Sequence, residues 1–311
     1  MPYLFAHFKE KWTPDGEQVY FALSRDGLRW ETLNGGAPVL TCTTGDGGCR
    51  DIEIVRLRTG GFVLLATDLC IVRHMDAEGR VDWRQLNHAG SRFLSCWRSD
   101  DLLSFSDQTL LFFGREDFGC LWAPEVFFDE SSGQYLIHWS ATVRESDFEH
   151  MAIWCCTTED FCTFSPPKLF FSQNESILDS HLVKHDGVYH LFFKHGDRPA
   201  MNMHAVSDAL FGPYRIDKGF SNSMAALDAP GAYEAPTTFV LPDGRWCLLL
   251  DFFGCEKEKM GYVPFLSPRA GDADFTMAKA AFSFPYGFKH GRVLEITPEE
   301  YARLKAHDTA R

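Results

Sequence analysis

The sequence lacks the features that would direct a chain into a membrane or onto nucleic acid. No run of about eighteen apolar residues occurs in it, and residues 1–12 contain no basic region followed by an apolar stretch and a cleavage site. Positive charge is scarce: 30 Lys and Arg stand against 43 Asp and Glu, a net charge of −13. Because nucleic acids and anionic membranes attract basic patches, we expect no nucleic-acid partner and no membrane partner.

Paired cysteine motifs are missing as well. The chain has 10 cysteines, most of them in strand-like runs, and none is spaced as C-x-x-C. This pattern predicts reduced core thiols in a cytoplasmic protein. The alternative is an exported disulfide protein from which a signal has been removed.

What the chain has in plenty is apolar and aromatic residues. They make up 45% and 14% of its 311 residues, with 28 Phe, and no low-complexity linker divides it. We expect a single globular domain over residues 1–311.

An internal repeat gives the architecture. Four segments share one form, in which an acid leads into a short apolar strand, a glycine-containing turn and a second apolar strand: RDIEIVRLRTGGFVLLATD (50–68), APEVFFDESSGQYLIHWS (123–140), LDSHLVKHDGVYHLFFK (178–194) and YEAPTTFVLPDGRWCLLLD (233–251). The acids are Asp51, Glu125, Asp179 and Glu234, at intervals of 74, 54 and 55 residues. Such hairpins repeated at this spacing are typical of β-propellers.

The two ends of the chain supply a fifth unit. KHGRVLEIT (289–297) resembles a first strand and starts with His290 in place of an acid, and PYLFAHF (2–8) lacks a partner. If the two pair, the propeller has five blades, and strands from both termini close the last one without an exposed sheet edge. Thr297 and Glu300 form a capping box, which predicts a short C-terminal helix over 297–306.

In a propeller the innermost strands line a central channel. We therefore expect the four acids and His290 to face one mouth of it, where their charges would repel one another unless they do chemistry or hold a cation. The alternative is that the acids cap strand ends or pair with Arg50, Lys194 or Lys289.

The ordered motifs resemble those of glycoside hydrolase family 43. They are RDI (50–52), LWAPE (121–125), ILDSH (177–181), YEAP (233–236) and KHG (289–291), and they span nearly the whole chain. The resemblance implies a five-bladed propeller acting on arabinosides or xylosides, with Asp51 as the general base, Glu234 as the general acid and Asp179 as the residue that tunes the pKa of the acid. The chain departs from the family pattern at Ile52, where proline is usual, and at Glu125, where many members have aspartate.

These roles agree with the chemistry of glycoside hydrolysis, which needs one protonated and one ionised carboxyl group. A carboxylate at Asp179 would raise the pKa of Glu234 by like-charge repulsion. Asp51, two blades away, would take a proton from water, and room for that water would make the enzyme inverting.

Further residues are expected around the sugar, and none implies an obligatory cofactor. Arg50, Trp122, Glu125, His181 and Lys194 are the expected substrate contacts. Two roles stay open for His290. It binds either a structural Ca²⁺, the central cation of the family, or a water cluster in its place; alternatively, it forms a hydrogen bond to Glu125.

Three functions therefore remain in play. The leading one is an inverting glycosidase that removes terminal α-L-arabinofuranosyl or β-D-xylosyl residues from small oligosaccharides in the cytoplasm. The others are an intracellular propeller phosphorylase, which needs a phosphate site of several cations, and a catalytically inactive sugar-binding propeller.

Overall fold

The computed structural model describes residues 1–10, 13, 15–113, 115–195, 202–227 and 231–309. Within these residues the strands form three four-stranded antiparallel sheets and one eight-stranded sheet, which a single parallel bridge joins from two four-stranded halves. We call these five units blades 1 to 5. Blade 1 contains β4 (Cys49–Arg56), β5 (Phe62–Asp68), β6 (Leu94–Ser99) and β7 (Thr109–Leu111). Blade 2 contains β8 (Trp122–Asp129), β9 (Gln134–Thr142), β10 (Met151–Thr158) and β11 (Lys168–Phe171).

The next two blades repeat this order from the inside outwards. Blade 3 contains β12 (Ile177–His185), β13 (Val188–His195), β14 (Asn202–Ser207) and β15 (Arg215–Ile216). Blade 4 contains β16 (Ala232–Val240), β17 (Trp246–Phe253), β18 (Gly261–Ser267) and β19 (Thr276–Met277). Short helices α1 (Trp83–Ala89) and α2 (Lys218–Ala225) lie in connections.

Blade 5 is built from both ends of the chain, as predicted. Its order is β20 (Lys289–Glu295), β1 (Tyr3–Phe8), β2 (Tyr20–Ser24) and β3 (Glu31–Thr32). Strands β1 and β20 are antiparallel, with Tyr3 opposite Glu295. One parallel bridge, Gly291 to Ile52, links this blade to blade 1.

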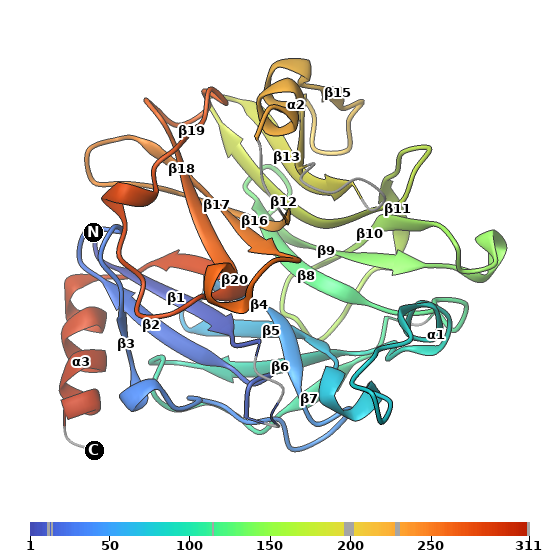
Figure 1. The fold of residues 1–311 in the computed structure, drawn as a ribbon, viewed down its shortest axis with the longest axis horizontal. Helices are drawn as coiled ribbons and strands as arrows, with labels where there is room; N and C mark the ends of the chain where they lie inside the picture. Colours follow the sequence, from blue (N-terminus) through green and yellow to red (C-terminus); the bar gives the residue numbers. More distant parts are fainter. Residues whose placement is uncertain (11–12, 14, 114, 196–201, 228–230, 310–311) are drawn as a thin grey trace.

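The inner strands close a ring. Strand β4 contacts β8, and contacts continue through β12, β16 and β20 back to β4. Figure 1 shows the sheets arranged around this centre, with the N-terminal strands beside β20. This all-β propeller agrees with the five blades that the repeat predicts.

Local sequence explains the hairpins. In blade 3 the turn consists of Asp186 and Gly187, with φ of 49° and 86°, and two left-handed residues are what a tight hairpin turn requires. The middle of each strand, residues 179–182 and 189–193, is buried, because each blade packs between two others.

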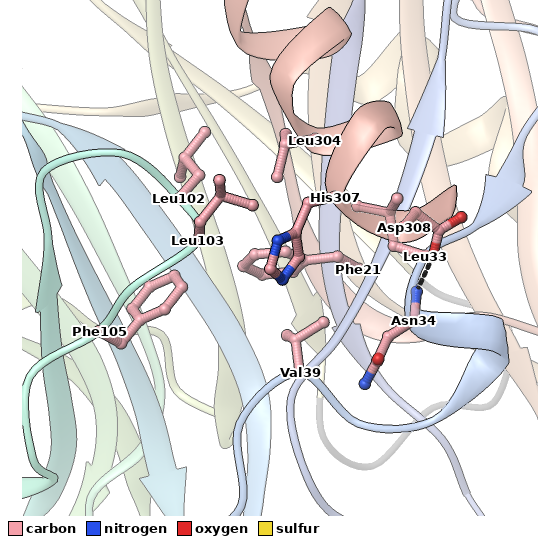
Figure 2. Close-up of a pocket in the computed structure, with 10 residues that line it drawn as sticks. All are labelled: Phe21, Leu33, Asn34, Val39, Leu102, Leu103, Phe105, Leu304, His307 and Asp308. Atoms are coloured by element: carbon pink, nitrogen blue, oxygen red, sulfur yellow. Dashed lines mark hydrogen bonds between the residues drawn. The ribbon is translucent and has the colours of Figure 1, made fainter. Parts of the chain in front are cut away.

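The predicted terminal helix is α3 (Pro298–Thr309). Its capping box is formed, since Thr297 N donates to Glu300 Oε2 (2.8 Å) and Glu300 N to Thr297 Oγ1 (3.2 Å). Glu300 also accepts from Arg56 of blade 1 at 2.7 Å. Figure 2 shows the small hollow that remains between α3, β2 and the 102–105 turn, a cavity of about 50 Å³.

The cysteines are free thiols, as predicted. All 10 lie within the described residues, and most of them are buried. Among the described residues, no helix is both long and apolar enough to cross a membrane.

Candidate active site

The inner strands share a backbone irregularity that shapes the site. In each of β4, β8, β12 and β16 the register with the neighbouring strand shifts by a bulge. The bulge holds one residue at positive φ: Asp51 (54°), Ala123 (50°), Asp179 (53°) and Ala235 (52°). Bulges re-aim side chains and cost backbone strain at non-glycine residues, which is common at functional sites.

This register corrects the alignment of the acids. Asp51 and Asp179 occupy equivalent positions, whereas Glu234 precedes the bulge residue of its strand and Glu125 lies two residues beyond it. A single ring of four equivalent acids was therefore wrong. Sequence spacing could not reveal this, because alanine gives no sign of a left-handed backbone.

Three of the acids nevertheless meet. A cavity of about 360 Å³ at one mouth of the channel, the main pocket, is lined by Asp51, Asp179 and Glu234 together with His290. The expected substrate contacts Arg50, Trp122 and Lys194 line it as well. The remaining lining residues are Phe8, Glu10, Leu69, Trp83, Leu178 and Phe253.

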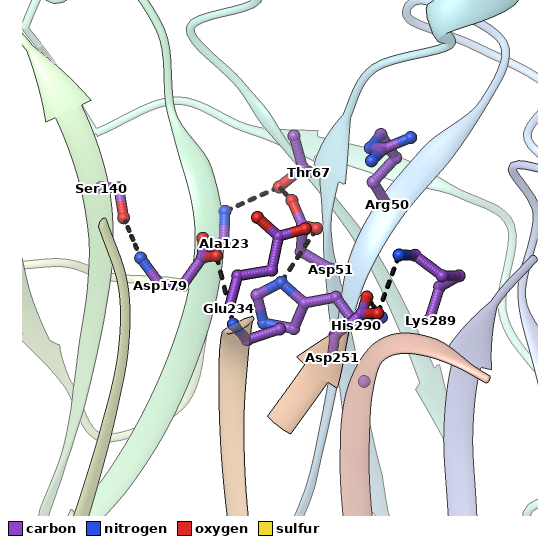
Figure 3. A network of polar contacts seen from close by, with 12 residues as sticks. Arg50, Asp51, Thr67, Ala123, Ser140, Asp179, Glu234, Asp251, Lys289 and His290 are labelled. Atoms are coloured by element: carbon purple, nitrogen blue, oxygen red, sulfur yellow. Dashed lines mark hydrogen bonds and ion pairs between the residues drawn. The ribbon is translucent and has the colours of Figure 1, made fainter. Parts of the chain in front are cut away.

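Asp51 is held as a carboxylate (Figure 3). Thr67 Oγ1 donates to its Oδ2 at 2.6 Å, and His290 Nδ1 lies 3.1 Å from its Oδ1. Burial alone would raise its pKa, but His290 and Arg50 outweigh burial and lower it to about 2. His290 in turn has its pKa raised to about 9, since the attraction of Asp51 exceeds the effect of burial. Its expected hydrogen bond to Glu125 is thus made to Asp51 instead.

Asp179 and Glu234 form the opposite side of the site. Asp179 is 7% exposed, and its Oδ2 accepts from the Ala235 backbone at 3.3 Å, which brings it beside Glu234. Burial raises the pKa of Asp179 to about 6, with repulsion from Glu234 adding to it and His290 opposing it.

The pKa of Glu234 is lowered by Lys194, whereas the sequence analysis predicts a raised pKa. The Nζ of Lys194 lies 2.6 Å from Glu234 Oε2. Burial raises the pKa of Glu234, but Lys194 and Lys289 together hold it below its usual range. In this pocket the raised pKa therefore belongs to Asp179 and not, as expected, to Glu234.

An ion pair that the sequence analysis does not predict lies near Glu234. Lys289 Nζ contacts Asp251 Oδ1 at 2.8 Å and Glu10 Oε2 at 3.1 Å, and both Lys289 and Asp251 are buried. Asp251 lies opposite Glu234 in the β16–β17 pairing. The signal was available, because an acid on a second strand opposite a first-strand acid shares its face of the sheet.

Glu125 and His181 lie deeper in the channel and do not line the main pocket. His181 is fully buried; Thr238 N donates to its Nε2 at 3.0 Å, while its Nδ1 lies 2.8 Å from both Glu125 Oε1 and Arg292 Nη1. Arg292 approaches the same group, 3.6 Å from Glu125 Oε2 and 3.9 Å from Glu53 Oε1. Their position at the second residue past the bulge turns them away from the mouth, and neither lines the main pocket.

The side chains deeper in the channel, Glu53, Glu125 and His181, do not fit a calcium ion. Calcium prefers six to eight oxygen ligands, whereas the guanidinium of Arg292 already supplies positive charge to the channel acids. Within the described residues, no three His, Cys, Asp or Glu side chains are grouped to hold a metal. Channel calcium and a metal role for His290 stay predictions.

Comparison with known proteins now decides the family. A family model described as a probable glycosyl hydrolase domain, related to glycoside hydrolase family 43, matches residues 1–302. The chain belongs to this glycoside hydrolase family.

Relatives of this family 43-related enzyme have several activities. An α-L-arabinofuranosidase of Bifidobacterium longum subsp. longum is 25% identical over 200 residues, which is 58% of this chain but only 18% of that protein. The crystal structure of a xylan β-1,4-xylosidase from Bacillus halodurans C-125 has a TM-score of 0.60 at 17% identity, covering 95% of this chain and 56% of the other. That of an endo-arabinase from Bacteroides thetaiotaomicron VPI-5482 has 0.52 at 16%, covering 74% and 79%.

The main pocket of this glycoside hydrolase can perform acid–base chemistry. It joins a carboxylate that stays ionised at neutral pH, Asp51, to a pair of carboxyl groups, Asp179 and Glu234, whose pKa values are pushed apart. Unequal carboxyl groups around one cavity are the arrangement that glycoside hydrolysis uses.

Proposed function

We propose that this enzyme hydrolyses terminal α-L-arabinofuranosyl or β-D-xylosyl linkages of short oligosaccharides, with inversion at the anomeric carbon. Asp51 is the general base that takes a proton from water, Glu234 the general acid at the leaving oxygen, and Asp179 the residue that tunes the acid. Arg50, Trp122 and Lys194 contact the sugar. A main pocket of about 360 Å³ suits a small ligand.

The observation that carries the proposal is the environment of Asp51. Its carboxylate faces the pocket, and His290, Arg50 and Thr67 favour its ionised form. A base must be unprotonated when it meets water, and a pKa of about 2 keeps Asp51 so throughout the neutral range.

Glu234 must carry a proton at the moment of reaction. Its ion pair with Lys194 opposes this in the free pocket. We propose that a bound sugar draws the Lys194 ammonium away, and that a proton held by the Asp179–Glu234 pair then serves the leaving oxygen. Asp179, with a pKa of about 6, is the member that retains a proton more readily before binding.

The same ion pair favours a second candidate, a propeller that binds sugars without cleaving them. If Lys194 keeps Glu234 ionised even with ligand bound, no acid is present. A phosphorylase has less support, because the cations of the pocket are already paired: Arg50 with Glu17, Lys194 with Glu234 and His290 with Asp51.

One assay separates the three candidates. The protein is incubated with nitrophenyl α-L-arabinofuranoside and nitrophenyl β-D-xyloside, with and without phosphate, and the first-formed anomer is followed by proton NMR. Phosphate-independent release with inverted configuration is expected. Release that requires phosphate would indicate the phosphorylase, and sugar binding without any release would indicate the binding protein.

We also propose a cytoplasmic setting. The ten free thiols support a reducing compartment, where disulfides are rare.

A further inference from the structure

A second hollow, which we call the side pocket, adjoins the main pocket. This cavity of about 230 Å³ shares Glu10, Arg50 and Trp83 with the main pocket. At about 30 Å³ per water molecule, it has room for roughly eight waters, which is enough for one sugar ring. A single terminal sugar at the acids would leave this space unused.

One wall of the side pocket is a long connection of blade 1. The β5–β6 connection, residues 69–93, is much longer than the equivalent connections 143–150 and 254–260. It has its own core of Leu69, Ile71 and Leu86. Asp76 Oδ1 stiffens its turn by accepting from the Glu78 and Arg80 backbone at 2.9 Å.

At the junction of the two pockets this wall presents an aromatic ring. Trp83 is 49% exposed and meets Trp122 edge to face, with ring centroids 6.1 Å apart. An exposed tryptophan at the mouth of a cavity offers a flat apolar face with a polar tip, which suits the C–H face and the hydroxyls of a sugar.

The floor of the side pocket carries an unsatisfied acceptor. Glu17 is 2% exposed; its Oε1 accepts from Arg50 Nη1 at 2.7 Å, whereas its Oε2 has no hydrogen-bond partner apart from the weak thiol donor of Cys70. A buried carboxylate oxygen without a strong donor is costly. A ligand hydroxyl would supply that donor.

The lining also indicates which side of the scissile bond the side pocket serves. It contains Arg50, the neighbour of Asp51, but neither Glu234 nor Lys194. The leaving group must lie against the acid, so a sugar held on the side of the base belongs to the part of the substrate that is transferred to water.

We infer that the side pocket is a subsite for a second sugar on the glycone side. The enzyme would then release a disaccharide unit, with the outer sugar stacked on Trp83 and a hydroxyl donated to Glu17. This inference rests on the proposed function and narrows it from single terminal sugars to terminal disaccharides.

The test compares aryl glycosides that differ by one glycone sugar. In the series that the enzyme accepts, nitrophenyl xylobioside or arabinobioside should have a kcat/KM at least about tenfold above that of the monoglycoside, the factor given by about 1.4 kcal/mol of added binding. The released glycone should be the intact disaccharide. Equal kcat/KM values, or release of single sugars from both substrates, would overturn the inference.

Two variants test whether the preference for the disaccharide glycoside depends on the side pocket. Val72→Phe fills this cavity and Trp83→Ala removes its ring, so each should lower the ratio of the two kcat/KM values toward one. Phe211→Ala is the matched control, since Phe211 is also an exposed aromatic residue, at 50%, but lies in the β14–β15 connection of blade 3. If the ratio of the two kcat/KM values is the same in all three variants, the inference is overturned.

Binding separates this inference from the proposed function. If no aryl glycoside is cleaved, the proposed function fails, but titration with xylose, xylobiose and the arabinose equivalents still tests the subsite. Tighter binding of a disaccharide, lost in Val72→Phe, would support it. Equal affinity for mono- and disaccharides would overturn it.

Discussion

Three carboxyl groups that share one pocket differ in how readily they hold a proton, and neighbouring cations account for the difference. His290 and Arg50 stabilise the charge on Asp51, Lys194 stabilises that on Glu234, and the charge on Asp179 has less compensation against burial. Lys194 stood among the partners that the sequence allowed for an acid. Lys194 pairs with Glu234 because of how blades 3 and 4 pack against each other, and no local sequence pattern predicts that packing.

Replacing Glu234 tests the acid. Glu234→Gln keeps the shape but cannot donate a proton, so substrates with poor leaving groups should lose roughly 10²–10⁴-fold in kcat, the usual contribution of general acid–base catalysis. Nitrophenyl substrates should lose less, because their leaving group needs little protonation. Steady-state kinetics on both classes make the comparison, and an equal loss would point to binding or structure.

Asp179→Asn should shift the pH–rate profile. It removes a negative neighbour of Glu234, so Glu234 ionises at lower pH and the basic limb of the profile moves toward acid. Asn is nearly isosteric, so thermal stability should change little. An unshifted limb with a low rate would mean that Asp179 only positions the substrate, and a large fall in Tm would mean a structural role.

Lys194→Met should shift the same limb the other way. Lys194 lowers the pKa of Glu234, so its loss raises that pKa and extends activity to higher pH. Lys194→Arg keeps the charge and serves as the control, with a limb close to that of the wild type. If the basic limb of Lys194→Met moved toward acid instead, the ion pair with Lys194 would not be what lowers the pKa of Glu234.

At the scale of elements, the sequence predicts the strands but does not predict their bulges. Alternating apolar residues and Asp-Gly turns marked the hairpins, and the capping box marked α3. The register shift in each inner strand puts Asp51 and Asp179 at positive φ but uses alanine in β8 and β16. Since nothing in an alanine favours that conformation, the sequence did not reveal that Glu125 lies deeper in the channel, two residues beyond the bulge, or that Glu234 reaches the mouth from one residue before it.

Strand β20 yields a prediction about packing. A Cβ added at Gly291 would lie 2.0 Å from Ala6 O of β1. Gly291→Ala should therefore destabilise the protein by about 1–3 kcal/mol, as overpacking does, and lower Tm by calorimetry. Gly219→Ala in α2 is the control, because the added carbon there meets only the Asp217 carboxylate, at 3.2 Å. Equal Tm values for the two variants would show that the close approach is not constraining.

At the scale of the whole molecule, the repeat predicted the propeller and its closure by both termini. The main pocket was predicted in outline, since three of the four acids meet there. The side pocket was not, because it depends on the long β5–β6 connection, which lies outside the repeat.

Closure makes β20 essential and α3 auxiliary. A chain ending at residue 288 lacks the inner strand of blade 5 and should not unfold cooperatively. A chain ending at residue 296 should fold with a lower Tm, because it loses the burial of side chains such as Leu304, worth about 1.5–3 kcal/mol each. Thermal melts followed by circular dichroism compare the two, and similar cooperative melts would show that closure is dispensable.

The pairing of Tyr3 with Glu295 also sets an order of events during translation. Strands β1 to β3 are made before the other blades, yet the inner edge of β1 has no partner until β20 has been translated. At about 5–20 residues per second, that edge waits tens of seconds while four other blades emerge. An unpaired strand edge is where chains join one another, so the nascent protein passes its most aggregation-prone interval on the ribosome, and a slower ribosome lengthens it.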